Sequence, residues 1–303
     1  MALALGNFDG VHLGHQAVLS ALGAAGDLLP AALVLDPHPR QVLRPEEPLQ
    51  LLTTMPERAA LLHAYGVKAA YRLPFSDEVR NMTPEAFVRE VLHERLGVRL
   101  VVVGSSYRFG HRAAGDVAAL RRLGRALDME VRVAPALRIG GEVVSASAIR
   151  RQLGAGRLAM ARRRLGRPYQ IGGMVVHGEG RGRRLGFATA NLALPAGKLR
   201  PADGIYAAFA GPPAGRWQMA AVHLGPRPMF GPEPVVEVHL LDGGDDLYGR
   251  HLEVALVRRL RPARAFASLD ALARQMANDV TEARRWLGEE ARLPRAVEPA
   301  TWL

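Results

Sequence analysis

The spacing of apolar residues changes once along this chain of 303 residues, near Ser147, and that change limits the folds open to it. Before Ser147, short aliphatic runs alternate with stretches in which apolar residues recur every three or four positions, as they do in amphipathic helices. After it, strand-like segments follow one another across turns rich in glycine and proline. Because the two halves have different periods, the sequence predicts two unlike domains and no internal duplication.

The first half predicts an α/β domain, a parallel sheet with helices on both faces. The expected strands are Leu3–Leu5, Ala31–Leu35, Ala69–Arg72, Leu100–Val103 and Val131–Pro135. The expected helices are His15–Gly23, Pro56–Tyr65, Pro84–Leu96 and Asp116–Leu127. In such a β-α-β-α alternation, ligands bind outside the carboxyl ends of the strands. We therefore expect the site residues of this domain directly after its strands.

The second half predicts a small antiparallel β-barrel that ends in a helix. Before the barrel, Ala148–Leu165 is expected to form one or two basic helices. The expected barrel strands are Gln170–Val176, Ile205–Ala210, Met219–Leu224, Val235–Leu240 and Leu252–Arg259. Ser268 suits the N-cap of a last helix that runs to Leu287. We place the two domains at residues 1–165 and 166–290, followed by a tail over 291–303.

Composition excludes several classes of function. The chain has no cysteine, which excludes disulfides and thiolate metal sites and fits a reducing compartment. No apolar stretch approaches the ~20 residues that a membrane span requires, and Met1–Leu5 is too short for a secretory signal, so we expect a cytoplasmic protein. The net charge of +11 would suit nucleic acid, but the basic residues are scattered and aromatic residues make up only 6%. We expect the charge to attract nucleotides and phosphorylated substrates instead.

The first motif that can hold phosphate is GNFDGVHLGH, over residues Gly6–His15, in a turn between a strand and a helix. Backbone N–H groups at a helix start, together with the positive end of the helix dipole, bind anions. His12 and His15 are three positions apart and can reach the same phosphates. They would stabilise a pentacoordinate phosphorus without a covalent intermediate. Alternatively, both histidines are polar residues at a helix start, and Gly10 and Gly14 serve only the turn.

Three further segments follow in order along the first half. They are Asp36–Pro39 (DPHP) after the second strand, Gly104–Gly110 (GSSYRFG) after the fourth, and Ser145–Arg150 (SASAIR) at the end of the domain. Together with the first motif, these segments resemble the FMN adenylyltransferase module of bacterial FAD synthetases. That module belongs to the HxGH nucleotidyltransferases, which have a Rossmann-like fold and transfer a nucleotide from a nucleoside triphosphate.

This resemblance implies roles for residues of the first half. The residues expected to be catalytic are His12, His15 and Arg150. The residues expected to bind the nucleotide are Gly6, Phe8, Asp9, Gly14 and Ser147. The residues expected on the flavin side are Asp36, His38, Tyr107, Arg108 and Phe109. The chain departs from the family at Ser106-Tyr107, where an Asp-Phe pair is usual, and at Ala146, where a hydroxyl is missing.

The second motif is a loop rich in glycine and arginine followed by Thr-x-Asn, over residues Gly178–Asn191. Glycines let the backbone approach phosphates closely, and the loop lacks the Lys-Ser/Thr ending of a Walker loop. Thr189 and Asn191 point to the same side of an extended segment and offer the hard oxygen ligands that Mg²⁺ prefers. Glu237, on an alternating strand, could accept the proton of an attacking hydroxyl. Alternatively, the loop is only a hairpin turn, and Glu237 is only an exposed charge on an edge strand.

With Pro201–Tyr206 and Asp246–Gly249, these segments resemble the riboflavin kinase module. That module is a small β-barrel that transfers the γ-phosphate of ATP to the ribityl 5′-hydroxyl of riboflavin. The resemblance assigns Thr189 and Asn191 to the metal and Glu237 to the catalytic base. The residues it assigns to the nucleotide are Gly178, Gly180, Gly182, Arg184 and Gly186.

Together the two resemblances imply a bifunctional riboflavin kinase and FMN adenylyltransferase. ATP would phosphorylate riboflavin to FMN, and a second ATP would adenylylate FMN to FAD with release of pyrophosphate. The expected cofactor is Mg²⁺, and the expected partners are riboflavin, FMN and ATP, without nucleic acid or membrane; weak self-association stays open. Three alternatives stay open: a riboflavin kinase with a weakened or inactive adenylyltransferase domain, an adenylyltransferase for another phosphorylated precursor, and a non-enzymatic flavin- or RNA-binding protein.

Overall fold

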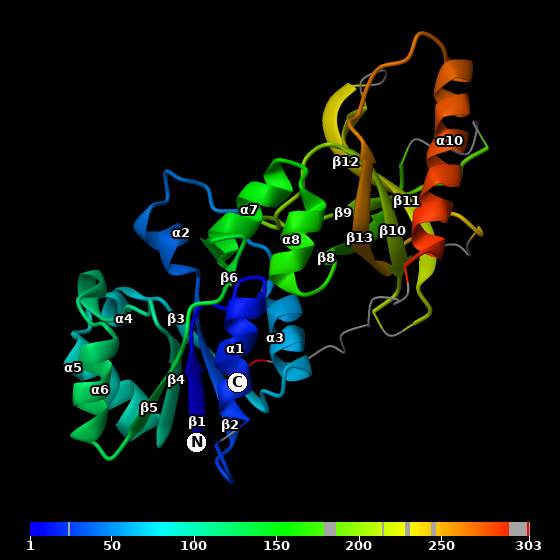
Figure 1. Cartoon of the computed structure of the whole chain (residues 1–303). Coiled ribbons are helices and arrows are strands. Elements are labelled where there is room, and N and C mark those ends of the chain that lie inside the picture. Colours follow the sequence, from blue (N-terminus) through cyan, green and yellow to red (C-terminus); the bar gives the residue numbers. More distant parts are fainter. Residues whose placement is uncertain are drawn as a thin grey trace. The chain divides into compact units, whose positions relative to one another are not determined.

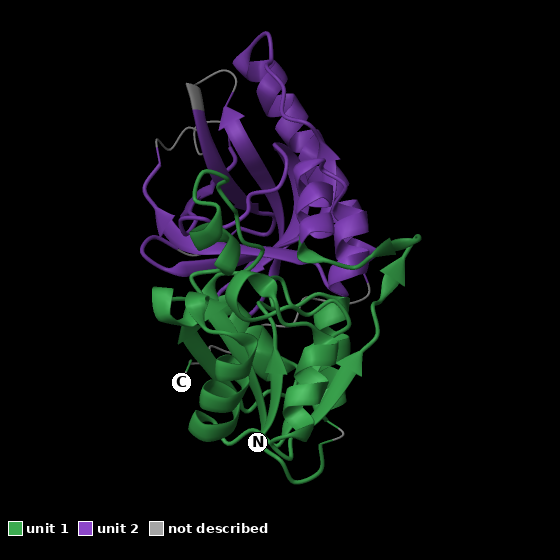
Figure 2. Cartoon of the chain, turned by 90° about the vertical axis from the view of Figure 1, so that its left-hand side faces the viewer, with its two compact units in different colours: residues 1–146, 299–303 green, residues 147–298 purple. Residues whose placement is uncertain are grey.

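The structure, a computed structural model, divides into two compact units (Figure 2). It describes residues 1–23, 25–178, 186–213, 215–227, 231–243, 247–290 and 302. The first unit is Met1–Ala146 with Pro299–Leu303, and the second is Ser147–Glu298. This division by contacts falls where the apolar period changes, whereas the domain boundary at residue 165 stays a prediction. The expected classes, a parallel α/β sheet and an antiparallel barrel, are confirmed.

The first unit is built on a five-stranded sheet in the order β3-β2-β1-β4-β5, parallel throughout (Figure 1). Its strands are β1 (Ala2–Leu5), β2 (Pro30–Asp36), β3 (Ala69–Pro74), β4 (Leu100–Gly104) and β5 (Glu130–Ala134). All four residues of β1 are buried, as expected for the centre of a sheet covered on both faces. The strand order reverses between β1 and β4, and open α/β sheets bind ligands at the carboxyl ends of the strands beside such a reversal.

Helices connect these strands. They are α1 (Leu13–Leu22), α2 (Pro39–Leu43), α3 (Met55–Ala64), α4 (Asp77–Asn81), α5 (Pro84–Ala86), the π-helix η1 (Phe87–Arg95), the 3-10 turn η2 (His111–Ala113) and α6 (Val117–Arg125). The expected helix over residues 84–96 is therefore α5 continued by η1. The short helices α2 and α4, and the hairpin of β6 (Arg138–Ile139) and β7 (Glu142–Val143), were not predicted because they are too short to show a period.

The second unit holds a closed barrel in the order β10-β11-β12-β9-β8-β13. Its strands are β8 (Tyr169–Val176), β9 (Ala190–Ala193), β10 (Gly204–Gly211), β11 (Gln218–Arg227), β12 (Gly231–Leu240) and β13 (His251–Arg261), all paired antiparallel. The five expected strands are present. The sixth, β9, is the segment that the sequence predicts only as extended.

The helices described in the rest of the chain are α7 (Ala146–Gly154), α8 (Leu158–Leu165) and α10 (Leu269–Gly288). Figure 1 shows α10 lying along the barrel, where its Ala283 and Leu287 pack with Phe209 of β10 in one buried cluster. The expected N-cap is confirmed, since the Ser268 hydroxyl accepts a hydrogen bond from the backbone N–H of Ala271 at 3.2 Å.

Within the predicted tail, the structure describes Trp302, whose indole N–H donates to the carbonyl of Met55 in the first unit at 3.1 Å. Among the described residues, no helix combines the length and the apolar character needed to cross a bilayer.

Candidate functional sites

The turn between β1 and α1 brings the two predicted histidines together. His12 caps α1, because its Nδ1 accepts a hydrogen bond from the backbone N–H of His15 at 3.2 Å. The two imidazole rings stack with their centroids 3.6 Å apart. A neutral histidine that accepts a hydrogen bond at Nδ1 carries its proton on Nε2. The structure thus shows the two histidines in contact, and their shared role in binding phosphates stays a prediction.

The same turn holds two buried non-glycine residues at positive φ, Phe8 at 48° and Val11 at 37°. Such conformations cost about 1–3 kcal/mol each and persist where the surrounding structure enforces them. The Phe8 ring lies edge-on to His15, with centroids 5.1 Å apart. A Cβ on Gly6 would come within 3.3 Å of the Phe8 ring, and one on Gly14 within 3.2 Å of the His12 ring. Both glycines therefore leave room for the rings of the site.

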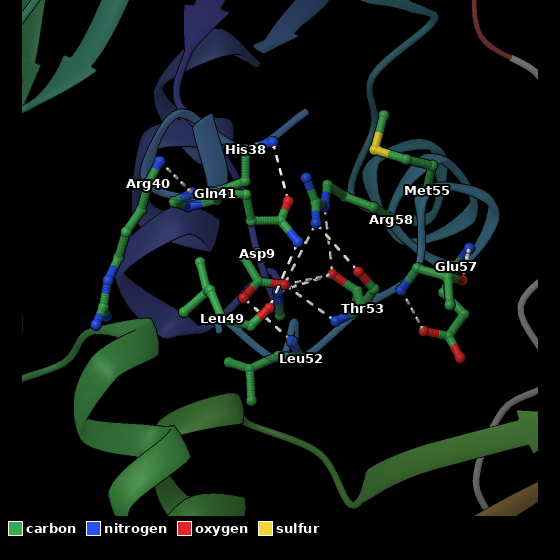
Figure 3. Close-up of polar contacts among 12 residues, drawn as sticks. Asp9, His38, Arg40, Gln41, Leu49, Leu52, Thr53, Met55, Glu57 and Arg58 are labelled. Carbon is green, nitrogen blue, oxygen red and sulfur yellow. Dashed lines mark hydrogen bonds and ion pairs between the residues drawn. The ribbon is translucent and has the colours of Figure 1, made fainter. Parts of the chain in front are cut away.

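Asp9, predicted to bind nucleotide, uses its side chain inside the protein (Figure 3). Its carboxylate accepts hydrogen bonds from the backbone N–H groups of Leu52 at 3.1 Å and Thr53 at 3.0 Å. The guanidinium of Arg58 lies 3.3 Å away, and both charged side chains are almost fully buried. The Thr53 hydroxyl in turn accepts the backbone N–H of Gly10 at 3.0 Å. These contacts, the buried clamp, tie the phosphate turn to the segment before α3; no motif in the sequence indicates Arg58.

The predicted flavin-side residues Asp36 and His38 lie where β2 leads into α2. Asp36 ends β2 and forms an ion pair with Arg72 at 3.5 Å. His38 is the N-cap of α2, and its Nδ1 accepts the backbone N–H of Arg40 at 3.1 Å. Since β2 neighbours β1 in the parallel sheet, this segment and the histidine turn share the carboxyl edge of the sheet.

The other predicted flavin-side residues follow β4, on the opposite side of β1. The rings of Tyr107 and Phe109 stack with centroids 5.7 Å apart, and both pack against the core of the first unit. Burial raises the pKa of the Tyr107 hydroxyl. Arg108 is exposed and lies 4.0 Å from Asp116, whose pKa is lowered chiefly by a hydrogen bond from the backbone N–H of Ala119.

Ser147 and Arg150 lie in α7. Ser147 is exposed in the first turn of this helix and Arg150 is half-buried one turn later. Ser147 is the first residue of the second unit. Their expected contact with the nucleotide held by the histidines stays a prediction.

In the barrel, the predicted base and one predicted metal ligand are cross-strand neighbours. Asn191 of β9 pairs directly with Glu237 of β12, and Glu237 pairs directly with His223 of β11. Directly opposed residues project from the same face of a sheet, with Cβ atoms about 4.5–5.5 Å apart. Thr189 lies just before β9 and is partly buried. Asn191, a predicted metal ligand, and Glu237, the predicted base, therefore meet on one face although they are 46 positions apart in the sequence.

Two basic residues that sequence reasoning missed face the carboxylate of Glu237. The Nδ1 of His223 lies 3.4 Å from Glu237 Oε2, and the Nη1 of Arg227 lies 3.5 Å from Glu237 Oε1. All three side chains are about four-fifths buried, with exposed fractions of 18% for His223, 22% for Arg227 and 19% for Glu237. Both residues belong to β11, for which the sequence predicts a strand but no site residue.

A pocket of about 320 Å³ lies beside this row. It is lined by Val176, His177, Gly178, Asn191, Leu192, Arg227, Pro234, Val235 and Val236. A Cβ on Gly178 would lie 2.1 Å from the Nδ2 of Asn191, so this first glycine of the loop lets the Asn191 amide take its place. Gly186 is exposed in a left-handed turn at φ 83°. The predicted nucleotide residues Gly180, Gly182 and Arg184 lie outside the described residues.

Comparison with known proteins matches both halves. A family model for FAD synthetase matches residues 1–148, and one for riboflavin kinase matches residues 165–287. The bifunctional riboflavin kinase/FMN adenylyltransferase of Escherichia coli K12 is 34% identical over 290 residues, which cover 94% of this chain and 92% of the relative. The enzyme of the same name from Pseudomonas fluorescens is 36% identical over 286 residues, covering 92% and 91%.

The fold also matches a solved structure over nearly its whole length. A crystal structure described as a macrolide-efflux protein from Streptococcus pneumoniae superposes with a TM-score of 0.84 at 30% identity, covering 94% of each chain. That likeness supports the fold, and the curated relatives, each more than 30% identical over more than 90% of both chains, decide the family. The chain belongs to the bifunctional riboflavin kinase/FMN adenylyltransferase family.

Proposed function

We propose that this chain makes FAD from riboflavin in two ATP-dependent transfers, with the kinase site in the barrel and the adenylyltransferase site in the α/β unit. Membership of the family supports a transferase with both activities. The observation that carries the assignment of residues is the row Asn191–Glu237–His223, which places a carboxylate and an amide side by side next to a pocket.

In the kinase step, Glu237 accepts the proton of the ribityl 5′-hydroxyl. The hydroxyl oxygen forms a bond to the γ-phosphorus of ATP, the bond from that phosphorus to the β–γ bridging oxygen breaks, and ADP leaves. His223 and Arg227 face the two carboxylate oxygens of Glu237 separately, which orients the base before the substrate arrives.

Thr189 and Asn191 would hold Mg²⁺ in this site. Their hydroxyl and amide oxygens are hard ligands, and Mg²⁺ completes its shell with water and nucleotide phosphates instead of an all-protein cage. Among the described residues, no cluster of three or more His, Cys, Asp or Glu side chains could hold a metal. The ion supplies neutralisation of the phosphate charge when bound.

In the adenylyl transfer, His12 and His15 donate hydrogen bonds to the phosphates of a second ATP at the start of α1. An oxygen of the FMN phosphate forms a bond to the α-phosphorus, the bond to the α–β bridging oxygen breaks, and pyrophosphate leaves. Ser147 and Arg150 would bind the triphosphate from α7, while Asp36 and the segment after β4 would face the flavin.

A time course tests this proposal. The purified protein is incubated with riboflavin, ATP and Mg²⁺, and the flavins are separated chromatographically. We expect FMN to rise first and then to give way to FAD. Accumulation of FMN without FAD would instead support the alternative of an inactive first domain, for which Ser106 and Ala146 are the reason. Unchanged riboflavin would overturn the kinase assignment.

The location of the protein is a separate proposal. We infer a cytoplasmic location from the cysteine-free composition and from substrates, ATP above all, that are made and used there. Fractionation of cells that express a tagged chain would check it.

A further inference from the structure

Arg227 faces two parts of the kinase site at once. Its guanidinium lies 3.5 Å from Oε1 of Glu237, and the residue also lines the pocket that includes Asn191 and Gly178. It stands at the end of β11, four residues after His223, which faces the other carboxylate oxygen. Arg227 is therefore positioned to contact both Glu237 and a ligand in the pocket.

The pocket needs positive charge if it is to hold phosphates. Among the described residues that line it, the others besides Arg227 and His177 are apolar residues, a glycine and Asn191. A guanidinium is always charged and presents its N–H donors in a planar fork that matches phosphate oxygens. Arginine–phosphate pairs are often bidentate, and charge-assisted bonds of this kind are about twice as strong as neutral ones.

The carboxylate of Glu237 needs an accessible oxygen to take up a proton. Oε2 is faced by the Nδ1 of His223 at 3.4 Å and Oε1 by Arg227. A hydroxyl must come within about 2.6–3.2 Å of one of these oxygens for proton transfer. If the guanidinium turns toward a phosphate in the pocket, Oε1 becomes open to the hydroxyl while His223 still orients the carboxylate through Oε2.

Resting on the kinase function proposed above, we propose that Arg227 binds the nucleotide phosphates of the kinase site and, in doing so, releases Oε1 of Glu237 for the riboflavin hydroxyl. Its partner changes from the carboxylate to the γ-phosphate oxygens, and no bond to Arg227 is made or broken in the transfer. The same guanidinium then stabilises the negative charge on the phosphoryl group during transfer. Nucleotide binding thereby makes the base available.

The test compares Arg227→Met with Arg227→Lys and with the matched control Arg284→Met. Arg284 makes an exposed ion pair with Asp242 at 2.9 Å in the same unit, outside the site. Initial rates are taken as the sum of FMN and FAD formed from riboflavin, because each FAD also counts one kinase turnover. Saturation curves for ATP and for riboflavin give KM and kcat separately.

For Arg227→Met we expect kcat/KM for ATP to fall about 10- to 100-fold, the equivalent of one charged hydrogen-bond partner, with KM for riboflavin unchanged. Arg227→Lys should recover part of the loss, since lysine keeps the charge without the fork. Arg284→Met should match the wild type. If Arg227 served only to hold Glu237, kcat would fall with an unchanged KM for ATP, and that result would overturn the proposal, as would wild-type kinetics.

Folding and function are kept apart by two further measurements. FAD formation from supplied FMN reports on the other unit, and circular dichroism reports on the barrel. If Arg227→Met does not fold, the test rests on Arg227→Lys. An unchanged KM for ATP in this variant would overturn the role of Arg227 in phosphate binding. A wild-type protein that makes no FMN would instead refute the kinase function itself.

Discussion

Replacing Arg58 with methionine is the sharpest test of the buried clamp in the first unit. The substitution removes the cation and leaves the Asp9 carboxylate in a place where the two side chains are 1% and 2% exposed. It also removes hydrogen bonds from the guanidinium to the hydroxyl of Thr53 at 3.3 Å and to its carbonyl at 3.1 Å. Methionine fills much of the volume of the arginine side chain, so the change acts mainly on charge.

The expected magnitude follows from these contacts. Removing one partner of a buried ion pair costs about 3–5 kcal/mol, because the remaining charge stays buried. Asp9 keeps its bonds from the backbone of Leu52 and Thr53, so we expect the lower end, about 3 kcal/mol. For a unit of this size, 1 kcal/mol shifts Tm by about 2–4 °C, which gives a decrease of about 6–12 °C.

The assay combines thermal unfolding with the two activities. The control Arg80→Met breaks an exposed ion pair with Asp77 in the same unit, worth about 0–1 kcal/mol. At 25 °C, well below the transition, we expect Arg58→Met to lower FAD formation from FMN while FMN formation from riboflavin persists. A Tm equal to that of the control, together with unchanged FAD formation, would refute the idea that the buried clamp holds the phosphate turn.

Three further predictions concern single side chains. Glu237→Gln should lower FMN formation about 10²- to 10⁴-fold, the usual contribution of a general base, and spare FAD formation from FMN; retained FMN formation would remove Glu237 as the base. His15→Ala should lower FAD formation from FMN and spare FMN formation from riboflavin, and loss of both activities would indicate misfolding. A hydrogen bond from Arg162 lowers the pKa of Glu290, so this pair stabilises the folded state above the ordinary glutamate range of about 4.3. The stability difference between Glu290→Gln and wild type in denaturant titrations should therefore be present at pH 7 and vanish as the pH falls through the lowered pKa.

The sequence predicts the elements whose apolar residues form a continuous run or a regular spacing, because such patterns are visible without any partner. All five strands of the sheet and five of the six barrel strands are of this kind. β9, α2 and α4 are short and carry neither a continuous apolar run nor a full period, so contacts with neighbouring elements decide their conformation.

Within the sites, the sequence predicts the residues of local motifs but not the side chains that contact them from elsewhere in the chain. The spacing of His12 and His15 predicts that they meet, and their rings are stacked. The clamp between Asp9 and Arg58 spans 49 positions, and no spacing along the chain indicates it. His223 and Arg227 face Glu237 only because of the register between β11 and β12, which a shift by one residue would reverse.

The shortness of β9 has a consequence for the dynamics of the kinase site. β9 pairs with β12 over Ala190 and Asn191 and with β8 over Asn191–Ala193, whereas β10 and β11 pair along Gly204–Ala210. Local opening of a protein requires the least free energy where backbone pairing and burial are least extensive. Asn191 thus stands on the part of the barrel that we expect to exchange its amide hydrogens fastest among the described strands. Nucleotide bound there would slow this exchange, so occupancy of the site could be followed without any turnover.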